Sequence, residues 1–396
     1  MDHRDARSHK RDVPAFLTQG FRPFFLAAGI WAAVALALWI VMFVTGSAVP
    51  SRFDPLTWHI HEMLFGFVMA AIAGFLLTAI PNWTGRLPVS GGPLALLAGL
   101  WLLGRIACLV SALVPAWIAM AADLAFQVAL VGVVTREIVV GRNWRNLPIV
   151  APVSILGIAN LLMHLEADGV AVPSGLGWRL GLAGVVVLIS VMAGRIVPSF
   201  TRNWLAKRPG TDLPAGHSWI DRLALGTLHA GLIGWAFLPT FRPIGLLLLL
   251  GAAINLWRLL RWRGFATAAE PLLLILHVGY AWLCLGAALL GAALLGVDVP
   301  LSAAIHALTA GAIGTMILAV MTRATRGHVG RELSADRVTV LIYVLVTLAA
   351  IMRVAAAFCA TWTMPLLIIS AILWIAAFAG FVLGYGPMLL LPRSPR

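Results

Sequence analysis

The sequence predicts an all-α protein: a polytopic membrane bundle of about twelve transmembrane helices. Of the 396 residues, 61% are hydrophobic and only 11% are charged. Apolar runs of roughly 18 to 25 residues, each long enough to cross a bilayer, recur from end to end. Because these runs are continuously apolar rather than alternating, we expect helices and not the strands of a closed barrel.

The expected spans follow the apolar runs in order. Their limits are 23–46, 56–81, 92–113, 116–140, 147–166, 176–198, 218–238, 241–260, 269–296, 300–323, 338–361 and 364–391. The polar start of the chain contains no apolar segment followed by a small-residue cleavage site, so no removable signal peptide is expected. The chain then divides into a basic cytoplasmic arm (1–22), a single twelve-helix transmembrane domain (23–391) and a cytoplasmic tail (392–396).

The basic residues predict the orientation of the bundle. The net charge is +13, and Lys and Arg concentrate in alternate connections, as the positive-inside rule requires. They are Arg4, Arg7, Lys10 and Arg11 in the arm, and Arg142, Arg145, Arg202, Lys207, Arg208, Arg261, Arg263, Arg326 and Arg331 in the loops. Both termini are therefore expected in the cytoplasm, and the charge indicates a lipid bilayer as partner and no nucleic acid.

Six histidines lie within the apolar runs, where an ionisable side chain is unfavourable and marks a candidate functional site. They are His59, His61, His164, His229, His277 and His306. Neutral imidazole is a common metal ligand, so these residues predict a heme or a transition metal inside the bundle. The alternative for each histidine is an ordinary hydrogen bond between helices.

His61 and His306 lie at matching depth, roughly two turns from the outer surface, on different helices. This placement fits the two axial ligands of a heme b. Because successive helical residues turn by about 100°, His59 and His61 point in nearly opposite directions. His61 shares its expected face with apolar residues such as Phe65, whereas His59 shares its face with Glu62. We therefore expect His61 to be the ligand and His59 a neighbouring or supporting group.

Two arginines lie at a similar depth, Arg105 on the third span and Arg353 on the eleventh. Arg105 can form a structural ion pair with Asp123 of the fourth span. Either arginine can instead bind heme propionates, which accept bidentate hydrogen bonds. Arg353 has no obvious carboxylate partner, which makes it the better propionate candidate.

A second centre, either copper or a second heme, has His164, His229 and His277 as candidate ligands from three helices. His277, Tyr280 and Cys284 share one helical face, which indicates either a ligand with a redox-active neighbour or packing alone. The chain has three cysteines, Cys108, Cys284 and Cys359. They lie singly in apolar segments and are interpreted as small buried hydrophobic residues.

An internal similarity relates the second and tenth spans. His61 precedes Gly66 by five residues, and His306 precedes Gly311 by the same separation. This indicates either a remnant duplication or convergent packing of small residues. Polar segments at the inner ends of three spans, 81–86, 194–204 and 321–330, are interpreted as helix ends with interfacial anchors, or as a cytoplasmic vestibule.

The chain resembles the NnrS family of bacterial membrane proteins. The resemblance rests on a few motifs that together cover nearly the whole chain. They are Gly20–Phe25, Trp58–Gly66 (WHIHEMLFG), Asn82–Arg86, Gly194–Asn203, His306–Gly311, Met321–Arg323 and Gly327–Gly330.

The resemblance implies a heme- and copper-containing protein of the bacterial inner membrane that responds to nitric oxide during denitrification and nitrosative stress. A more distant similarity is to the catalytic subunits of heme-copper oxidases and nitric oxide reductases, which also have heme histidines on the second and tenth spans. The seventh span carries His229 but no adjacent histidine pair, so the usual oxygen-reducing centre is not expected.

Three functions remain open at this point. The first is binding of nitric oxide or its redox conversion at a His-ligated heme, which as a reductase-like oxidoreductase would need a quinol or cytochrome electron donor. The second is a non-enzymatic heme or metal sensor, or a protection protein against nitrosative stress. The third is a transporter of a nitrite-like anion.

Overall fold

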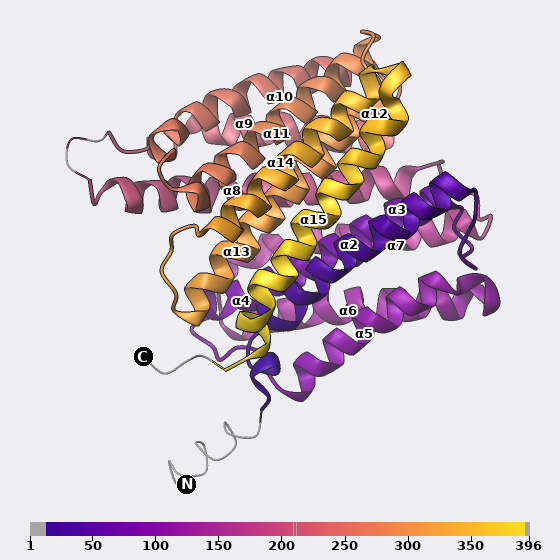
Figure 1. Ribbon diagram of the computed structural model, residues 1–396, viewed down its shortest axis with the longest axis horizontal. Helices are drawn as coiled ribbons and strands as arrows, with labels where there is room; N and C mark the ends of the chain where they lie inside the picture. Colours follow the sequence, from indigo (N-terminus) through magenta and orange to yellow (C-terminus); the bar gives the residue numbers. More distant parts are fainter. Residues whose placement is uncertain (1–12, 209, 211, 393–396) are drawn as a thin grey trace. The chain divides into compact units, whose positions relative to one another are not determined.

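A computed structural model describes residues 13–208, 210 and 212–392, and in these residues the protein is helical with no strand (Figure 1). Arg4, Arg7, Lys10 and Arg11 of the expected arm, and tail residues 393–396, lie outside the described residues. The predicted fold class is confirmed: the protein is a polytopic bundle of membrane helices.

The helices form two compact units. Unit 1 comprises Met1–Ala171, Ala324–Glu332 and Val382–Arg396, and unit 2 comprises Val172–Arg323 and Leu333–Phe381. The expectation of one domain over 23–391 stays a prediction.

Unit 1 contains five long helical segments. They are α2 (Phe21–Thr45), the continuous run α3 (Pro55–His61), η2 (Glu62–Val68) and α4 (Met69–Thr84), then α5 (Gly92–Leu109), α6 (Ala116–Val140) and α7 (Val150–Ala167). Within this unit α2 packs on η2 and α4, and α6 packs on α4, α5 and α7. The boundaries of α6 are those expected from its apolar run.

Unit 2 contains the remaining segments, except for the last residues of α13 and α15, which belong to unit 1. They are α8 (Leu176–Leu205), α9 (Trp219–Phe237), α10 (Pro243–Leu260), α11 (Pro271–Leu295), the run α12 (Leu301–His306), η6 (Ala307–Gly314) and α13 (Thr315–Val329), then α14 (Arg337–Phe358) and α15 (Thr363–Leu390). Short 3-10 turns lie at Ala15–Leu17, Ser111–Leu113, Trp144–Ile149, Gly264–Thr267 and Ala360–Trp362.

Eleven helices in the described residues are long and apolar enough to cross a membrane. The expected span at 218–238 corresponds to α9, which is not one of the eleven. Its first turn carries Asp221 and Arg222, which shorten the apolar part of the helix. That α9 crosses the membrane, and that both termini are cytoplasmic, stay predictions.

Two of the long segments are interrupted by π-helix. The segment η2 begins directly after His61, and η6 begins directly after His306. A π-turn inserts an extra residue into the helical repeat, so it changes which side chains share a face. The internal similarity seen in the sequence therefore corresponds to the same local structure in both units.

Three helices continue beyond the ends expected from hydropathy. The helix α4 includes Pro81 and ends at Thr84, α8 includes Pro198 and ends at Leu205, and α13 ends at Val329. The three helices end within or directly after these polar segments, as interpreted, but one to two turns beyond the limits expected for the spans. Apolar length measures the thickness of hydrocarbon crossed, whereas the backbone hydrogen bonds of a helix continue into polar sequence.

Candidate metal centre

His61 lies fully buried in unit 1, and both of its ring nitrogens contact polar side chains. Its Nδ1 is 3.0 Å from Glu62 Oε1, and its Nε2 is 2.7 Å from Asn160 Oδ1 and 3.1 Å from Asp123 Oδ2. His164 Nε2 also lies 3.1 Å from Asp123 Oδ2. The histidine of α3 is thus joined to α6 and α7 through polar contacts.

Arg105 of α5 stands between the two carboxylates of this region. Its guanidinium donates to Glu62 Oε2 at 2.7 Å and to Asp123 Oδ1. Trp31 Nε1 donates to Glu62 Oε2 at 2.7 Å, and Asn160 Nδ2 donates to Asp123 Oδ2 at 2.6 Å. The predicted Arg105–Asp123 ion pair is present, and Glu62 is a second partner of the same arginine.

Cys108, one turn beyond Arg105 on α5, completes a group of potential metal ligands. One ligand atom each from His61, Cys108, Asp123 and His164 lies within 4.8 Å of the others, and all four residues are buried. In the part of the chain that the structure describes, this is the one such group of three or more ligating residues. We name the seven residues the His61 cluster: His61, Glu62, Arg105, Cys108, Asp123, Asn160 and His164.

The electrostatics of the His61 cluster favour a cation. Glu62 and Asp123 face the single guanidinium of Arg105, so one negative charge is uncompensated while both histidines are neutral. A buried charge in a membrane protein requires a counter-charge. Either a proton on a histidine or a metal ion would supply it.

The donor set matches a four-coordinate transition-metal ion. Two imidazoles, a thiolate and a carboxylate are ligands of zinc and copper. Ligand atoms around such an ion are separated by roughly 3 to 4 Å, so a small inward movement of these side chains suffices. Glu62 then holds His61 through Nδ1, and Arg105 and Asn160 hold Asp123, as hydrogen-bond partners of metal ligands commonly do.

Glu62 occupies a different face from the one expected. The sequence pattern places Glu62 with His59, but in the structure the Glu62 carboxylate contacts His61. Glu62 directly follows His61, so its flexible side chain reaches the neighbouring imidazole although an ideal helical wheel places the two residues about 100° apart. His59 instead stacks on Trp39, with ring centroids 4.3 Å apart, outside the His61 cluster.

In unit 2, His306 has a different environment. Its Nδ1 lies 2.7 Å from the carbonyl oxygen of Ser302, one turn earlier on α12. Because a carbonyl only accepts, Nδ1 carries the proton and Nε2 is the lone-pair nitrogen, the form in which histidine ligates metals. His61 and His306 belong to different units, so their pairing on one heme stays a prediction.

Around each π-helix the packing is repeated. Gly66 lies against Trp31 of α2, and a Cβ there would be 2.4 Å from the indole nitrogen. Gly311 lies against Trp282 of α11, with a corresponding distance of 2.6 Å. The two long segments also end alike. Gly85 follows His61, and Gly330 follows His306, by the same number of residues, and both glycines have a positive φ.

The three histidines proposed for a second centre belong to different units, so a centre that they share stays a prediction. His164 belongs to the His61 cluster in unit 1. In unit 2, His229 Nε2 lies 2.7 Å from Ser190 Oγ, and His277 Nε2 lies 3.0 Å from Thr201 Oγ1. Neither His229 nor His277 belongs to a group of ligating residues among the described parts of the chain.

The face carrying Tyr280 forms part of a buried network that the sequence does not reveal. The Tyr280 hydroxyl donates to Asn255 Oδ1 at 2.6 Å and accepts from Arg258 at 2.7 Å. Arg258 also donates to Asp221 at 2.8 Å. Arg258 is nearly fully buried and joins α9, α10 and α11, so this network stabilises unit 2.

Arg353, on α14 of unit 2, is half-buried. Across the described residues its guanidinium forms no hydrogen bond or ion pair. Its proposed role as a propionate ligand stays a prediction. Arg105, in contrast, is already held by two carboxylates.

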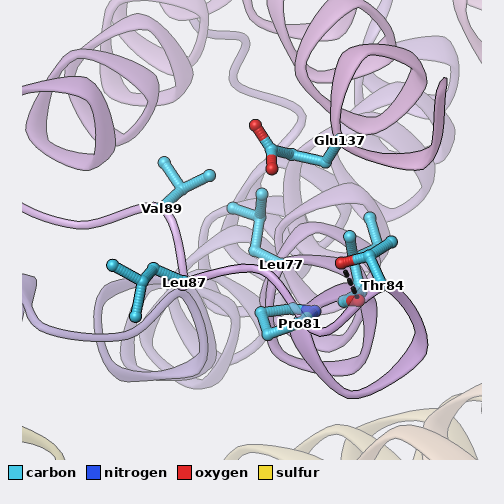
Figure 2. A pocket seen from close by; sticks show the side chains of 7 residues that line it. Leu77, Pro81, Thr84, Leu87, Val89 and Glu137 are labelled. Atoms are coloured by element: carbon cyan, nitrogen blue, oxygen red, sulfur yellow. Dashed lines mark hydrogen bonds between the residues drawn. The ribbon is translucent and has the colours of Figure 1, made fainter. Parts of the chain in front are cut away.

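A small recess lies at the C-terminal ends of α4 and α6 in unit 1 (Figure 2). Its lining is Leu77, Ile80, Pro81, Thr84, Leu87, Val89 and Glu137. Glu137 accepts from Arg86 Nε at 2.6 Å, so the only carboxylate of the lining is already paired. This mainly apolar recess gives little support to the vestibule interpretation of the 81–86 segment.

Sequence reasoning missed Cys108 and Asn160 as members of the site. Cys108 looks like any small buried residue until α5 packs beside α6, and Asn160 is one polar residue in an apolar run. The sequence contained one clue: Arg105, Asp123, Asn160 and His164 all interrupt neighbouring apolar spans at similar depth.

The fold and the site together define a class: a multi-pass helical membrane protein with a buried cluster of ligating and charged side chains. The family model described as NnrS protein matches residues 15–393. The match spans nearly the whole sequence, so the chain belongs to the NnrS family, and this membership fits a role in the nitric oxide response. No curated protein matches the chain.

Proposed function

We propose that the protein is a metal-containing membrane protein of the nitric oxide response, in which His61, Cys108, Asp123 and His164 bind one transition-metal ion. The observation that carries this proposal is the buried group of four ligand atoms within 4.8 Å of one another. The second carboxylate beside Arg105 supports it, because a bound cation can take the place of the proton that otherwise balances this charge on His61.

Copper is the metal we favour. A thiolate and two imidazoles suit both copper and zinc, and geometry alone does not separate them. The family resemblance implies copper, and copper can exchange an electron with a bound nitrogen oxide, whereas zinc is redox-inert. In this role Glu62, Arg105 and Asn160 orient the ligands, and the apolar helices around them exclude water.

His306 is our candidate ligand for heme b. Its Nδ1 hydrogen bond to Ser302 fixes the ring and presents Nε2, the arrangement typical of a ligating histidine. When bound, a heme would supply an iron that binds gases. Arg353 is the candidate partner of the heme propionates, since none of the described carboxylates pairs with it. A heme shared with His61 would require His61 Nε2 to leave Asp123 and Asn160.

We place this activity in the bacterial inner membrane, with nitric oxide as the ligand. If nitric oxide is reduced, the electrons come from a quinol or a cytochrome. If it is only sensed or sequestered, no donor is needed. Turnover of nitric oxide by the purified protein with a chemical reductant separates these two versions.

The test is metal analysis and optical spectroscopy of the detergent-purified protein, oxidised and then reduced, before and after nitric oxide. Because the chain has one group of candidate ligands, we expect about one copper ion per chain. We also expect b-type absorption bands in the reduced protein, and we expect His306→Ala to remove them. His61→Ala is expected to remove the copper. Protein without copper or heme would contradict the proposal.

Transport of a small anion is the second candidate. Transporters commonly place helix interruptions at corresponding positions of two repeats, beside the substrate site. The π-helices η2 and η6 occupy corresponding positions in two long segments, each directly after a histidine, and both segments stay helical throughout. Uptake of nitrite by proteoliposomes containing the metal-free protein would favour this candidate, whereas no uptake would exclude it.

A further inference from the structure

Gln127 is a buried amide that makes no hydrogen bond to any described residue. It lies on α6, one turn after Asp123, and only 1% of its surface is exposed. Neither Nε2 nor Oε1 has a partner in the described part of the chain. Asn160 of the His61 cluster, in contrast, uses both ends of its amide, on Asp123 and on His61.

The space beside the Gln127 amide is bounded by a glycine. A Cβ added at Gly157 of α7 would be 3.7 Å from Gln127 Oε1. On α7, Gly157, Asn160 and His164 succeed one another at helical spacing of three and four residues, so they share a face. The amide therefore lies between α6 and α7, about 6 Å along the helix from Asp123.

An amide in this position is unfavourable unless something completes its hydrogen bonds. The membrane interior offers no bulk water, so an unpaired donor and acceptor lose their solvation without compensation. A leucine would fill a similar volume without this penalty. The presence of glutamine indicates that its polarity has a use beyond packing.

We infer that Gln127 binds a water-sized polar ligand of the metal ion in the His61 cluster, which is either water or a nitrogen oxide. The amide N–H donates to the ligand, and the amide oxygen accepts if the ligand carries a proton. Gly157 has no side chain, and a Cβ there would be in van der Waals contact with Oε1, at 3.7 Å. This inference rests on the proposed metal site and specifies where its exogenous ligand sits.

The first experiment compares the copper-loaded wild-type protein with Gln127→Leu. Without nitric oxide, electron paramagnetic resonance in ¹⁷O-enriched water is expected to show broadening that the variant loses if the ligand is water. With nitric oxide added, the infrared N–O stretch, assigned with ¹⁵NO, is expected to shift in the variant if a nitrogen oxide is held. Loss of one hydrogen bond should weaken nitric oxide binding by about tenfold.

Two further variants separate a polar role from packing. Leu130 lies on the same buried face of α6 as Gln127, so Leu130→Val is the control for packing and should leave both spectra unchanged. Gly157→Ala adds a methyl group beside the amide and should weaken ligand binding while copper content stays the same. The midpoint of thermal unfolding of Gln127→Leu should equal or exceed that of the wild type, since an unpaired amide is removed.

The outcomes distinguish this inference from the proposed function. If the wild type binds no metal, both are contradicted. If copper is bound but Gln127→Leu leaves the broadening, the N–O stretch and the affinity unchanged, only the role of Gln127 is overturned. A lowered unfolding midpoint with unchanged ligand signals would assign Gln127 to packing and also overturn it.

Discussion

The two π-helical regions begin alike and differ in the residue directly after each histidine. In unit 1, His61 precedes Glu62, whose carboxylate reaches the histidine and Arg105. In unit 2, His306 precedes Ala307, and its ring is held by a backbone carbonyl. The shared parts are the histidine, the π-helix, and a glycine against a tryptophan.

This difference separates the scaffold from its chemistry. The π-helix and the glycine–tryptophan contact set the position of a histidine on a membrane helix, and they occur in both units. Carboxylates gather around the histidine only in unit 1, as far as the described residues extend, and there they can balance a cation. We therefore interpret the two regions as one structural device used for two ligands, a metal ion and a heme.

The largest difference in stability is expected between substitutions of Arg105 and Arg353. Arg105 lies on α5, the first long helix after the segment with η2, and Arg353 lies on α14, the first long helix after the segment with η6. Arg105→Leu leaves Glu62 and Asp123 buried without a counter-charge, so the free energy of unfolding should fall by about 3–5 kcal/mol. Arg353→Leu breaks no ion pair among the described residues and should change it by less than about 1 kcal/mol. Reversible unfolding in mixed micelles measures both.

The heme spectrum sharpens the same contrast. Arg353→Leu should shift the reduced bands if Arg353 holds a propionate, whereas Arg105→Leu should not shift them directly. Equal loss of stability in the two variants would contradict the view that, of these two arginines, only Arg105 is held by buried carboxylates.

The glycine–tryptophan contacts should behave equally in both units. Gly66→Ala places a methyl group against Trp31, and Gly311→Ala places one against Trp282, at distances that force one partner to move. Overpacking of this kind lowers stability by about 1–3 kcal/mol. Thermal unfolding of each variant provides the measurement, with Gly99→Ala as the control, since nothing lies within 4 Å of a Cβ there. A large effect in one unit alone would break the structural equivalence.

A smaller effect is expected from Asn160, which we propose orients the metal ligand Asp123. Asn160→Ala removes the hydrogen bond to Asp123 without removing a ligand, so copper affinity should fall by about 10- to 100-fold. Competition with a chelator measures the affinity. His59→Phe, which keeps an aromatic ring on Trp39, is the matched control and should bind copper normally. An unchanged affinity in Asn160→Ala would place the metal elsewhere.

The sequence predicted most of the fold because bilayer thickness imposes helix length. The limits of α6 agree with the apolar run, and other helices differ mainly where polar residues extend them, as at Thr84 and Val329. The separation of His61 from Gly66, repeated between His306 and Gly311, was enough to indicate that the two regions are similar.

The composition of the site was harder to predict. The ion pair of Arg105 with Asp123 was one of the two alternatives for Arg105, beside binding of a heme propionate, because opposite charges at equal depth in lipid can pair. The contacts of the Glu62 carboxylate with His61 and Arg105 depend on how its flexible side chain packs against α5, which a helical wheel does not specify. The contribution of Cys108 depends on how α5 packs, which apolar runs do not specify.

The most direct test of the central claim is X-ray absorption at the copper edge, combined with metal quantification, on the wild type and Cys108→Ser. The metal site in the His61 cluster predicts bound copper with one sulfur and two imidazole ligands, and loss of the sulfur contribution in Cys108→Ser. Copper with the same ligand shell in both proteins, or wild-type protein with no copper, would contradict it.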